Sequence, residues 1–506
     1  MNFKQQIPYS SPKSRKFSLK PTSAWAATIG LFSVSLIGLA IGAGSIISLA
    51  FPLGAFMVGI FLYQKYPLLY VGFTWWMWFL CPLVKRLIDY KSGYGTFGSL
   101  TLSAGLVTSI SFVTLWKHLP RYITSLSARD GLPFILCIGS VVYAFAVGLI
   151  VQSPVQPRYA FLSIMNWLAP ICFGFHLFIN WREYPRYRQN MQRIFYWGAV
   201  VMGIYGIIQF FLVPGWERFH VDILGDDFSL GWYGTPEPMQ IRVWSTMQNP
   251  FDFSKIWVSS MILLSISKGN SNILLNGLGY IILLMTRVRT AWYTWFLSFL
   301  FLASSLKQDK QIRIIISFAI VIVIVVPLIF TSSFSSTIVE RLETMIDIGN
   351  DNSFEVRFFE TAKMVNYALS HFLGVGLLGT SAVSVYGSDI LFHSVDNGYV
   401  TLFVSLGWSG IIPYLTGLAL IFAKLYQSNA MRSDIFLVAS RAIATGAFLA
   451  VLTTHISHGA GALNLWGFLG IAMAGNKYHI YQRYRQDNRA LKPSNLQNKS
   501  TPHPIV

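Results

Sequence analysis

The chain has 506 residues, of which 54% are hydrophobic and 11% carry a charge. A soluble protein of this length would divide into several domains, whereas apolar runs that repeat along the chain indicate one polytopic α-helical membrane bundle. The formal net charge of +18 would suit nucleic-acid binding, but basic loops on the cytoplasmic side of a membrane explain it better. We therefore expect the lipid bilayer, and no nucleic acid, among the partners.

Three segments follow one another along the chain. Residues 1–22 are basic and are interpreted as a cytoplasmic tail before an uncleaved span. Residues 23–476 are predicted to form one all-α membrane domain of about 14 spans. Residues 477–506 are basic and then rich in Ser, Asn and Pro, which predicts a disordered cytoplasmic tail. The spans are expected near residues 24–41, 46–63, 67–83, 98–116, 132–151, 159–180, 194–213, 252–268, 272–285, 290–306, 314–330, 397–424, 435–453 and 462–476.

Two spans depart from a simple apolar helix. The 272–285 run is short, which suggests a tilted segment, a re-entrant segment or misplaced bounds. The 397–424 run is long and contains Gly407, Gly410 and Pro413, so we expect a kink there.

The charges orient the bundle. With the N-terminus inside, most Lys and Arg residues fall in cytoplasmic segments, as the positive-inside rule requires. The basic residues Lys85, Arg86 and Lys91 violate the rule, which makes the 67–116 region the least secure. Most acidic residues fall in two predicted extracytoplasmic loops, 215–251 and 331–396, and the second loop precedes the third-last span.

The 331–396 loop is predicted to contain structure of its own. Phe358, Ala362, Val365 and Leu369 recur at helical spacing, which predicts an amphipathic helix across the mouth of the bundle. The Gly374-Val-Gly376 sequence then turns the chain back toward the next span. His371, just before it, fits the C-terminal end of that helix.

Four arginines map to the same outer side: Arg242, Arg287, Arg289 and Arg357. A guanidinium group stays protonated and offers paired donors that match phosphate oxygens. The set therefore suits a lipid pyrophosphate at the membrane boundary. The alternative is that each side chain reaches to lipid headgroups or pairs with an acid of the loops.

Other residue types give weaker signals. The three cysteines lie in apolar runs with no ligand spacing, and no Cys/His cluster suits a metal, so we expect no metal and no cofactor. Aromatic residues of the outer loops, such as Tyr233 and Trp244, fit either sugar stacking or an interfacial belt. Arg441 lies inside a span and needs a partner there.

Together these motifs resemble the O-antigen ligase and polysaccharide polymerase superfamily of bacterial membrane glycosyltransferases. The resemblance covers residues 240–420 and rests on four motifs in order: Arg242 through Asn249-Pro250, Arg289-Thr-Ala291, Arg357 with His371-Phe-Leu-Gly-Val-Gly376, and Asp396-Asn-Gly-Tyr399 with Gly407 and Gly410.

The resemblance implies a GT-C type fold in the bacterial inner membrane, active on the extracytoplasmic face. It implies a polyprenyl-pyrophosphate-linked oligosaccharide as donor, an acceptor glycan, and chain-length or export proteins as further partners. Arg289, Arg242 and Arg357 would contact the donor pyrophosphate, and Arg287, Asn397 and Tyr399 complete the predicted substrate-binding set.

One motif departs from the family pattern. Ligases commonly show His-Asn where this chain has Asp396-Asn397, with His393 one helical turn earlier. We therefore favour a polymerase of exopolysaccharide or O-antigen-like repeat units over a ligase, and a transporter of lipid-linked glycans is the alternative from another class. Asp396 or His393 is the expected base, against the alternatives of a helix cap for Asp396 and a solvated loop position for His393.

Overall fold

The computed structural model describes residues 22–93, 102–124, 130–151, 157–224, 231–267, 270–306, scattered residues between 308 and 323, 352–377, 397–428, 434–452 and 459–490. Its regular elements in these ranges are helices, and an isolated antiparallel bridge joins Gly234 to Ile241. The predicted all-α class is confirmed.

Apolar helices of 19 to 29 residues dominate the first half of the chain, with shorter helices between them. They are α1 (Thr22–Ala40), α2 (Gly44–Lys65), α3 (Pro67–Ser92), α4 (Leu102–Ser109), α5 (Phe112–Thr124), α6 (Leu132–Val151), α7 (Pro157–Ile179), the 3-10 turn η3 (Trp181–Glu183), α8 (Tyr184–Leu212) and α9 (Gly215–Ile223).

The second half contains the helices around the predicted site. They are α11 (Pro250–Ile266), α12 (Asn270–Met285), α13 (Arg289–Ser304), α16 (Asn352–Ser370), α18 (Gly398–Gln427), α19 (Ile435–Ala450) and α20 (Gly459–Ala490). Non-helical backbone at Gly407 breaks α18, which confirms the predicted kink.

Seven helical segments in the described ranges are long and apolar enough to cross a membrane. They span Thr22–Ala40, Gly44–Lys65, Pro67–Ser92, Leu132–Val151, Ala160–Ile179, Trp181–Leu212 and Gly398–Gln427. A polytopic membrane protein is therefore supported, whereas the count of about 14 spans stays a prediction. Most of the expected span at 314–330 lies outside the described residues.

The expected span at 98–116 is wrong as a single helix. The chain forms α4, turns at Ile110 and Ser111, and continues as α5, whose amphipathic sequence includes Pro120. Eight residues of α4 rise about 12 Å, which is less than half of the hydrocarbon core, so α4 alone cannot span it.

The predicted disorder of the 477–506 tail is also wrong for its first part, because α20 continues to Ala490. Two of its polar side chains bind acids of other elements: Lys477 Nζ lies 3.3 Å from Asp130 Oδ2, and His479 Nε2 lies 3.3 Å from Asp434 Oδ2. These two contacts stabilise the helical form of this segment, and the composition of the tail alone does not reveal them.

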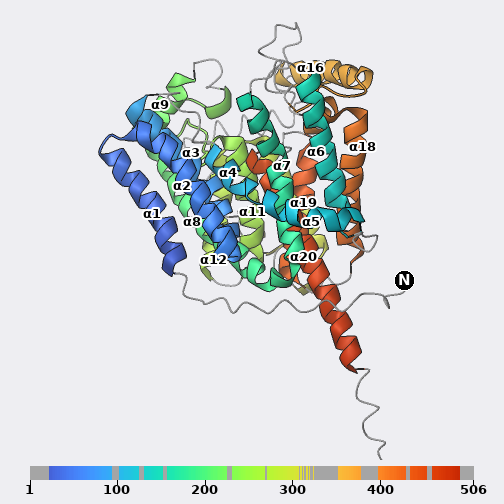
Figure 1. Ribbon diagram of the computed structural model, residues 1–506. Coiled ribbons are helices and arrows are strands. Elements are labelled where there is room, and N and C mark those ends of the chain that lie inside the picture. The colour runs from blue at the N-terminus through green and yellow to red at the C-terminus, as the bar shows by residue number, and fades with distance from the viewer. Residues whose placement is uncertain are drawn as a thin grey trace, which may run out of the picture.

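The bundle has two distinct ends (Figure 1). Helices α9 and α16, which come from the two acidic loops, lie at one end. The C-terminal turns of α20 protrude from the opposite end, where α1 begins. Helices from both predicted extracytoplasmic loops thus share one end, which we call the loop end.

Close helix packing joins α7 to α20 in the core. A methyl group on Gly470 would lie 2.3 Å from the carbonyl oxygen of Gly174, so only glycine permits this approach. Small residues serve membrane helices in this way because lipid provides little hydrophobic drive for association. Nearby, the ring of Trp75 packs against Phe195 and Phe468 and fills the space between α3, α8 and α20.

Candidate active site

The site begins with a segment that is irregular and yet buried, residues 241–249, which we call the inner loop. Ile241, Val243, Trp244 and Ser245 are each 0% exposed. Irregular backbone inside a membrane bundle is tolerated only where protein groups satisfy its hydrogen bonds. The burial of Trp244 makes it a packing residue, rather than the sugar-stacking or interfacial residue that the sequence suggested.

Side chains from the first half of the chain supply these hydrogen bonds. Gln209 on α8 accepts from the backbone nitrogens of Trp244 at 3.0 Å and Ser245 at 2.7 Å through one side-chain oxygen. Thr246 donates from its hydroxyl to the carbonyl oxygen of Phe79 on α3 at 2.5 Å. The loop is therefore fixed to α3 and α8, and not only to its sequence neighbours.

Arg86 on α3 makes the strongest of these contacts. Its guanidinium donates to the carbonyl oxygens of Ser245, at 2.6 Å, and Met247. Its Nε lies 2.9 Å from a carboxylate oxygen of Glu217 on α9, and the two side chains are 2% and 0% exposed. Lys85 pairs in the same way with Asp89. The apparent violation of the positive-inside rule at these residues is thus explained by internal pairing.

The inner loop meets the turn before α13. The backbone nitrogen of Val243 donates to the carbonyl oxygen of Met285 at 3.1 Å, which joins the segment of Arg242 to the segment of Arg287 and Arg289. Three of the four predicted arginines therefore come from neighbouring backbone, although Arg242 lies more than 40 residues before the other two.

The three arginines have different environments. Arg287 has a positive φ of 53°, and its two terminal nitrogens each donate at 2.8 Å, to the carbonyl oxygens of Met239 and Gln240. Its contacts favour a role in holding this turn, although its predicted substrate contact stays a prediction. Arg289 is the first residue of α13, and Arg242 donates its backbone nitrogen to Tyr233 at 2.7 Å.

Two helices begin a few residues after this contact. Asn249 caps α11 by accepting the backbone nitrogen of Asp252 at 2.8 Å, and α13 begins at Arg289. The start of α18 binds the end of α19 through Gly398 and Val451 at 2.7 Å, and α20 begins at Gly459. Helix N-termini carry partial positive charge and unsatisfied N–H groups, so the starts of α11 and α13 favour an anion.

Part of the chain matches a known protein family. Residues 274–415 match the protein family described as O-antigen ligase. The predicted resemblance to the O-antigen ligase and polysaccharide polymerase superfamily is confirmed. No curated protein matches the chain.

The O-antigen ligase segment covers seven of the eight predicted site residues: Arg287, Arg289, Arg357, His393, Asp396, Asn397 and Tyr399. Arg242 and the inner loop precede it. The candidate site therefore combines residues of the O-antigen ligase segment with Arg242 and the inner loop, which lie before that segment.

Asn397 and Tyr399 both have structural partners at the start of α18. Asn397 caps the helix, because its side-chain oxygen accepts the backbone nitrogens of Tyr399 at 3.0 Å and Val400 at 3.3 Å. The Tyr399 hydroxyl donates to the carbonyl oxygen of Phe448 at 2.8 Å. The cap that the sequence allowed for Asp396 is therefore provided by its neighbour. The predicted substrate contacts of Asn397 and Tyr399 stay predictions.

Within the O-antigen ligase segment, α16 confirms the predicted loop helix. Ala362 and Leu369 are exposed, whereas Met364 and Ala368 are buried against Val375 and Val404. The helix thus packs against α18 through residues outside the predicted apolar set, a contact that the periodicity of α16 alone cannot reveal. His371 follows the last residue of α16 and donates its backbone nitrogen to Tyr367, as expected at a helix end.

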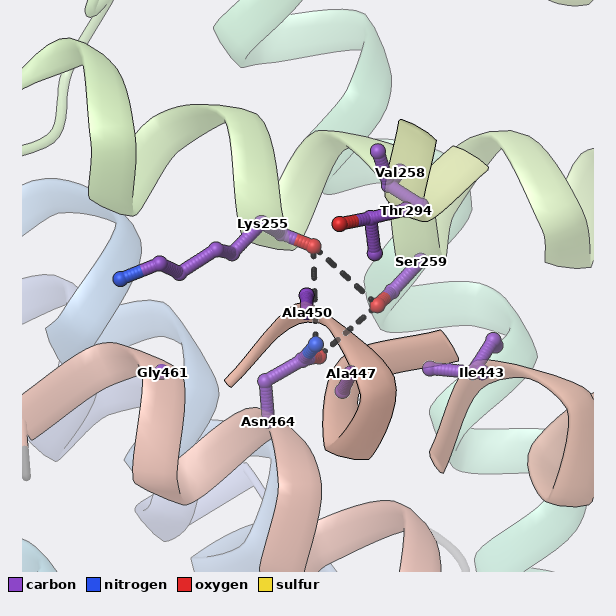
Figure 2. A pocket seen from close by; sticks show the side chains of 9 residues that line it. All are labelled: Lys255, Val258, Ser259, Thr294, Ile443, Ala447, Ala450, Gly461 and Asn464. Carbon is purple, nitrogen blue, oxygen red and sulfur yellow. Dashed lines mark hydrogen bonds between the residues drawn. The ribbon is translucent and has the colours of Figure 1, made fainter. Parts of the chain in front are cut away.

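A narrow pocket lies beside these helix starts, between α11, α13, α19 and α20 (Figure 2). Ser259 donates to the side-chain oxygen of Asn464 at 2.9 Å inside it. The Lys255 ammonium extends away from this pair and lies 3.8 Å from Asp252. The polar groups of the pocket thus join α11 to α20.

The remaining predicted residues lie outside the described structure. His393 and Asp396 fall in 378–396, and the side chain of Arg357 is not described although its backbone belongs to α16. In the described ranges, no three His, Cys, Asp or Glu side chains gather where they would hold a metal ion. The expected independence from metal stays a prediction.

Sequence reasoning missed Arg86, Glu217 and Gln209. The available signal was the cluster of Lys85, Arg86 and Lys91 that contradicted the positive-inside rule. A basic residue in an otherwise apolar run at the wrong side of the membrane indicates an internal partner.

Proposed function

We propose that the protein is a GT-C type membrane glycosyltransferase that polymerises exopolysaccharide or O-antigen-like repeat units from a polyprenyl-pyrophosphate-linked donor. The site would face the extracytoplasmic side of the bacterial inner membrane. The observation that carries the proposal is the hydrogen bond between Val243 and Met285, which joins the Arg242 and Arg289 segments beside the starts of α11 and α13.

The reaction needs a group that stabilises a departing pyrophosphate. The acceptor hydroxyl attacks the anomeric carbon of the donor glycan, a new glycosidic C–O bond forms, and the C–O bond to the lipid pyrophosphate breaks. Negative charge develops on the departing oxygen, and fixed guanidinium groups of Arg242 and Arg289 stabilise it without a metal. The partial positive charge at the starts of α11 and α13 stabilises the same departing oxygen.

The attacking hydroxyl must also lose its proton. Asp396 is the proposed acceptor of that proton, and His393 is the second candidate. The cap formed by Asn397 supports this assignment, because Asp396 is not needed to begin α18. An Asp at the position where ligases commonly show His favours a polymerase over the alternative ligase activity, in which glycan passes to a lipid or protein acceptor.

A transporter of lipid-linked glycans is the rival from another class. Transporters place broken helices and charges around a site near the bilayer midplane. Here the kink of α18 at Gly407 is occupied by backbone of residues 372–376, so it offers no open midplane site in the described structure. The transferase proposal also gives Arg242 and Arg289 a role, which is to stabilise the departing pyrophosphate.

Purified protein in proteoliposomes, supplied with one lipid-linked repeat unit, tests the proposal. We expect glycan of increasing length and release of polyprenyl pyrophosphate. Transfer of a single unit to an added acceptor would support the ligase alternative, and movement of donor between leaflets without bond formation would support the transporter. Absence of any product or movement, with donor bound, would contradict all three.

A further inference from the structure

We infer that Arg86 is a positioning residue that holds the inner loop in the form that presents Arg242 beside Arg289. The inference rests on the proposed role of Arg242, and it assigns a function to a residue on α3 that lies far outside the O-antigen ligase segment.

The geometry of the Arg86 contacts supports this role. The guanidinium reaches two carbonyl oxygens of the inner loop, those of Ser245 and Met247, which are two residues apart. Ser245 has a positive φ of 52°, which is uncommon for a residue other than glycine and persists only where surrounding contacts enforce it. Arg86 binds the loop at this residue, three positions after Arg242.

The anchor is itself fixed. Glu217 pairs with Arg86 Nε and accepts the hydroxyl of Tyr205 at 2.5 Å, and Trp216 donates to that hydroxyl at 2.6 Å. These contacts tie α3 and α9 to α8. The guanidinium is therefore held from one side by α9 while it binds the loop on the other.

Stability alone does not account for an ion pair at this place. A buried pair is often no more stabilising than apolar side chains of the same volume, because both charges lose their hydration. An arginine has five donors in a planar fork, so it can pair with a carboxylate and still bind two carbonyl oxygens. A lysine is a single point donor on a flexible stem and cannot hold both carbonyls in one geometry.

Two variants separate positioning from folding. Arg86→Met with Glu217→Gln removes the ion pair without leaving one buried charge, and glutamine still accepts from Tyr205. Arg86→Lys keeps the charge beside Glu217 but loses the fork. Lys85→Met with Asp89→Asn is the matched control, because it neutralises the neighbouring ion pair of the same helix, α3.

Hydrogen–deuterium exchange of the purified proteins is the first measurement. Exchange of the amides at residues 243–248 should be at least tenfold faster in the Arg86→Met/Glu217→Gln variant than in the control, with Arg86→Lys between them, while exchange in α11 and α13 is unchanged. Equal exchange of the loop in the test and control variants would overturn the inference, whatever the activity.

Donor kinetics in proteoliposomes are the second measurement. The value of kcat/KM for the lipid-linked repeat unit should fall about a hundredfold in the Arg86 double variant, since small displacements of a binding group are costly, and should not fall in the control. A loosened loop with unchanged kinetics, in a protein that Arg242→Ala inactivates, would overturn the positioning role. Full activity of Arg242→Ala would instead defeat the proposed function, and the exchange result would still decide whether Arg86 anchors the loop.

Discussion

Gly374 and Gly407 meet backbone to backbone. A methyl group on Gly374 would lie 2.5 Å from the nitrogen of Gly407, and one on Gly407 would lie 2.3 Å from the carbonyl carbon of Leu373. The break in α18 receives the segment after α16: Val375 donates to Val404 at 2.9 Å, and Trp408 donates to Phe372 at 2.9 Å. The predicted turn at Gly374 therefore packs directly against the predicted kink at Gly407.

This contact predicts that Gly407→Ala destabilises the protein. Gly407 has φ 59°, so alanine would be strained as well as crowded, at a cost of about 2 kcal/mol or more in the free energy of unfolding. Thermal melting of the protein in detergent measures the loss. Gly139→Ala on α6 is the control, because nothing lies within 4 Å of the added methyl, and it should be neutral or slightly stabilising. Equal melting temperatures of the two variants would contradict the account.

The arginine assignment predicts loss of polymer in Arg242→Ala and Arg289→Ala, with normal amounts of protein in the membrane. Lysine at either position should restore activity only in part, because an ammonium lacks the paired donors of a guanidinium. Gel analysis of the glycan chains measures the outcome. Near-normal polymer from both alanine variants would exclude a role in binding pyrophosphate.

The cap on α18 sharpens the test of Asp396. We expect Asp396→Asn to be inactive and still to bind donor, whereas His393→Ala keeps partial activity. Since Asn397 caps the helix, loss of activity in Asp396→Asn has no explanation in a lost cap. Asn397→Asp is the control: aspartate caps as well as asparagine, so the melting temperature should not change. Full polymer synthesis by Asp396→Asn would leave His393 as the next candidate.

We expect His220 on α9 to make the free energy of unfolding depend on pH. Burial, together with the nearby charges of Arg86 and Lys85, lowers the pKa of His220 to about 3. In the unfolded chain the pKa is about 6.5, so unfolding takes up a proton between pH 3 and pH 6.5. The native state therefore loses stability as the pH falls through this window, by about 2 kcal/mol from pH 6.5 to pH 5.

His220→Phe should remove this part of the pH dependence and keep the ring packed against Tyr233 and Trp244. Melting curves at pH 5 and pH 6.5 measure the difference. His371→Phe, at an exposed position, is the control for replacing a histidine by phenylalanine. The same slope in His220→Phe and the wild type would show that His220 does not titrate with unfolding.

Topology is tested by labelling with a thiol reagent that does not cross membranes. Ser335→Cys should react from outside intact cells, and Ser494→Cys should react only after the cells are opened. The three native cysteines are buried, and their removal gives a clean background. Reaction of residue 335 only from the cytoplasmic side would reverse the predicted orientation.

Local chemistry determined the helices of this protein. Apolar runs gave α1, α2, α6 and α7 within two residues at each end, because membrane helices satisfy their hydrogen bonds within one segment. The structure extends α3 nine residues beyond its expected end and begins α8 ten residues before its expected start. The break at Gly407, the turn at Gly374 and the family resemblance were also readable, since each depends on residue types close together in sequence. The loop helix was predicted, but its buried face depended on contacts with α18.

Only the tertiary structure decided how the candidate site is assembled. The binding of Arg86 to the carbonyls of Ser245 and Met247 joins residues about 160 positions apart, and no local pattern encodes that pairing. No local pattern encodes the hydrogen bond between Val243 and Met285 either. Nor does one show that Asn397 caps α18, since the sequence equally allowed Asp396 to be the cap. A side chain's role at such a place depends on which partner the fold brings within hydrogen-bond distance. The guanidinium of Arg86, which binds carbonyl oxygens of a segment far along the chain, is the example here.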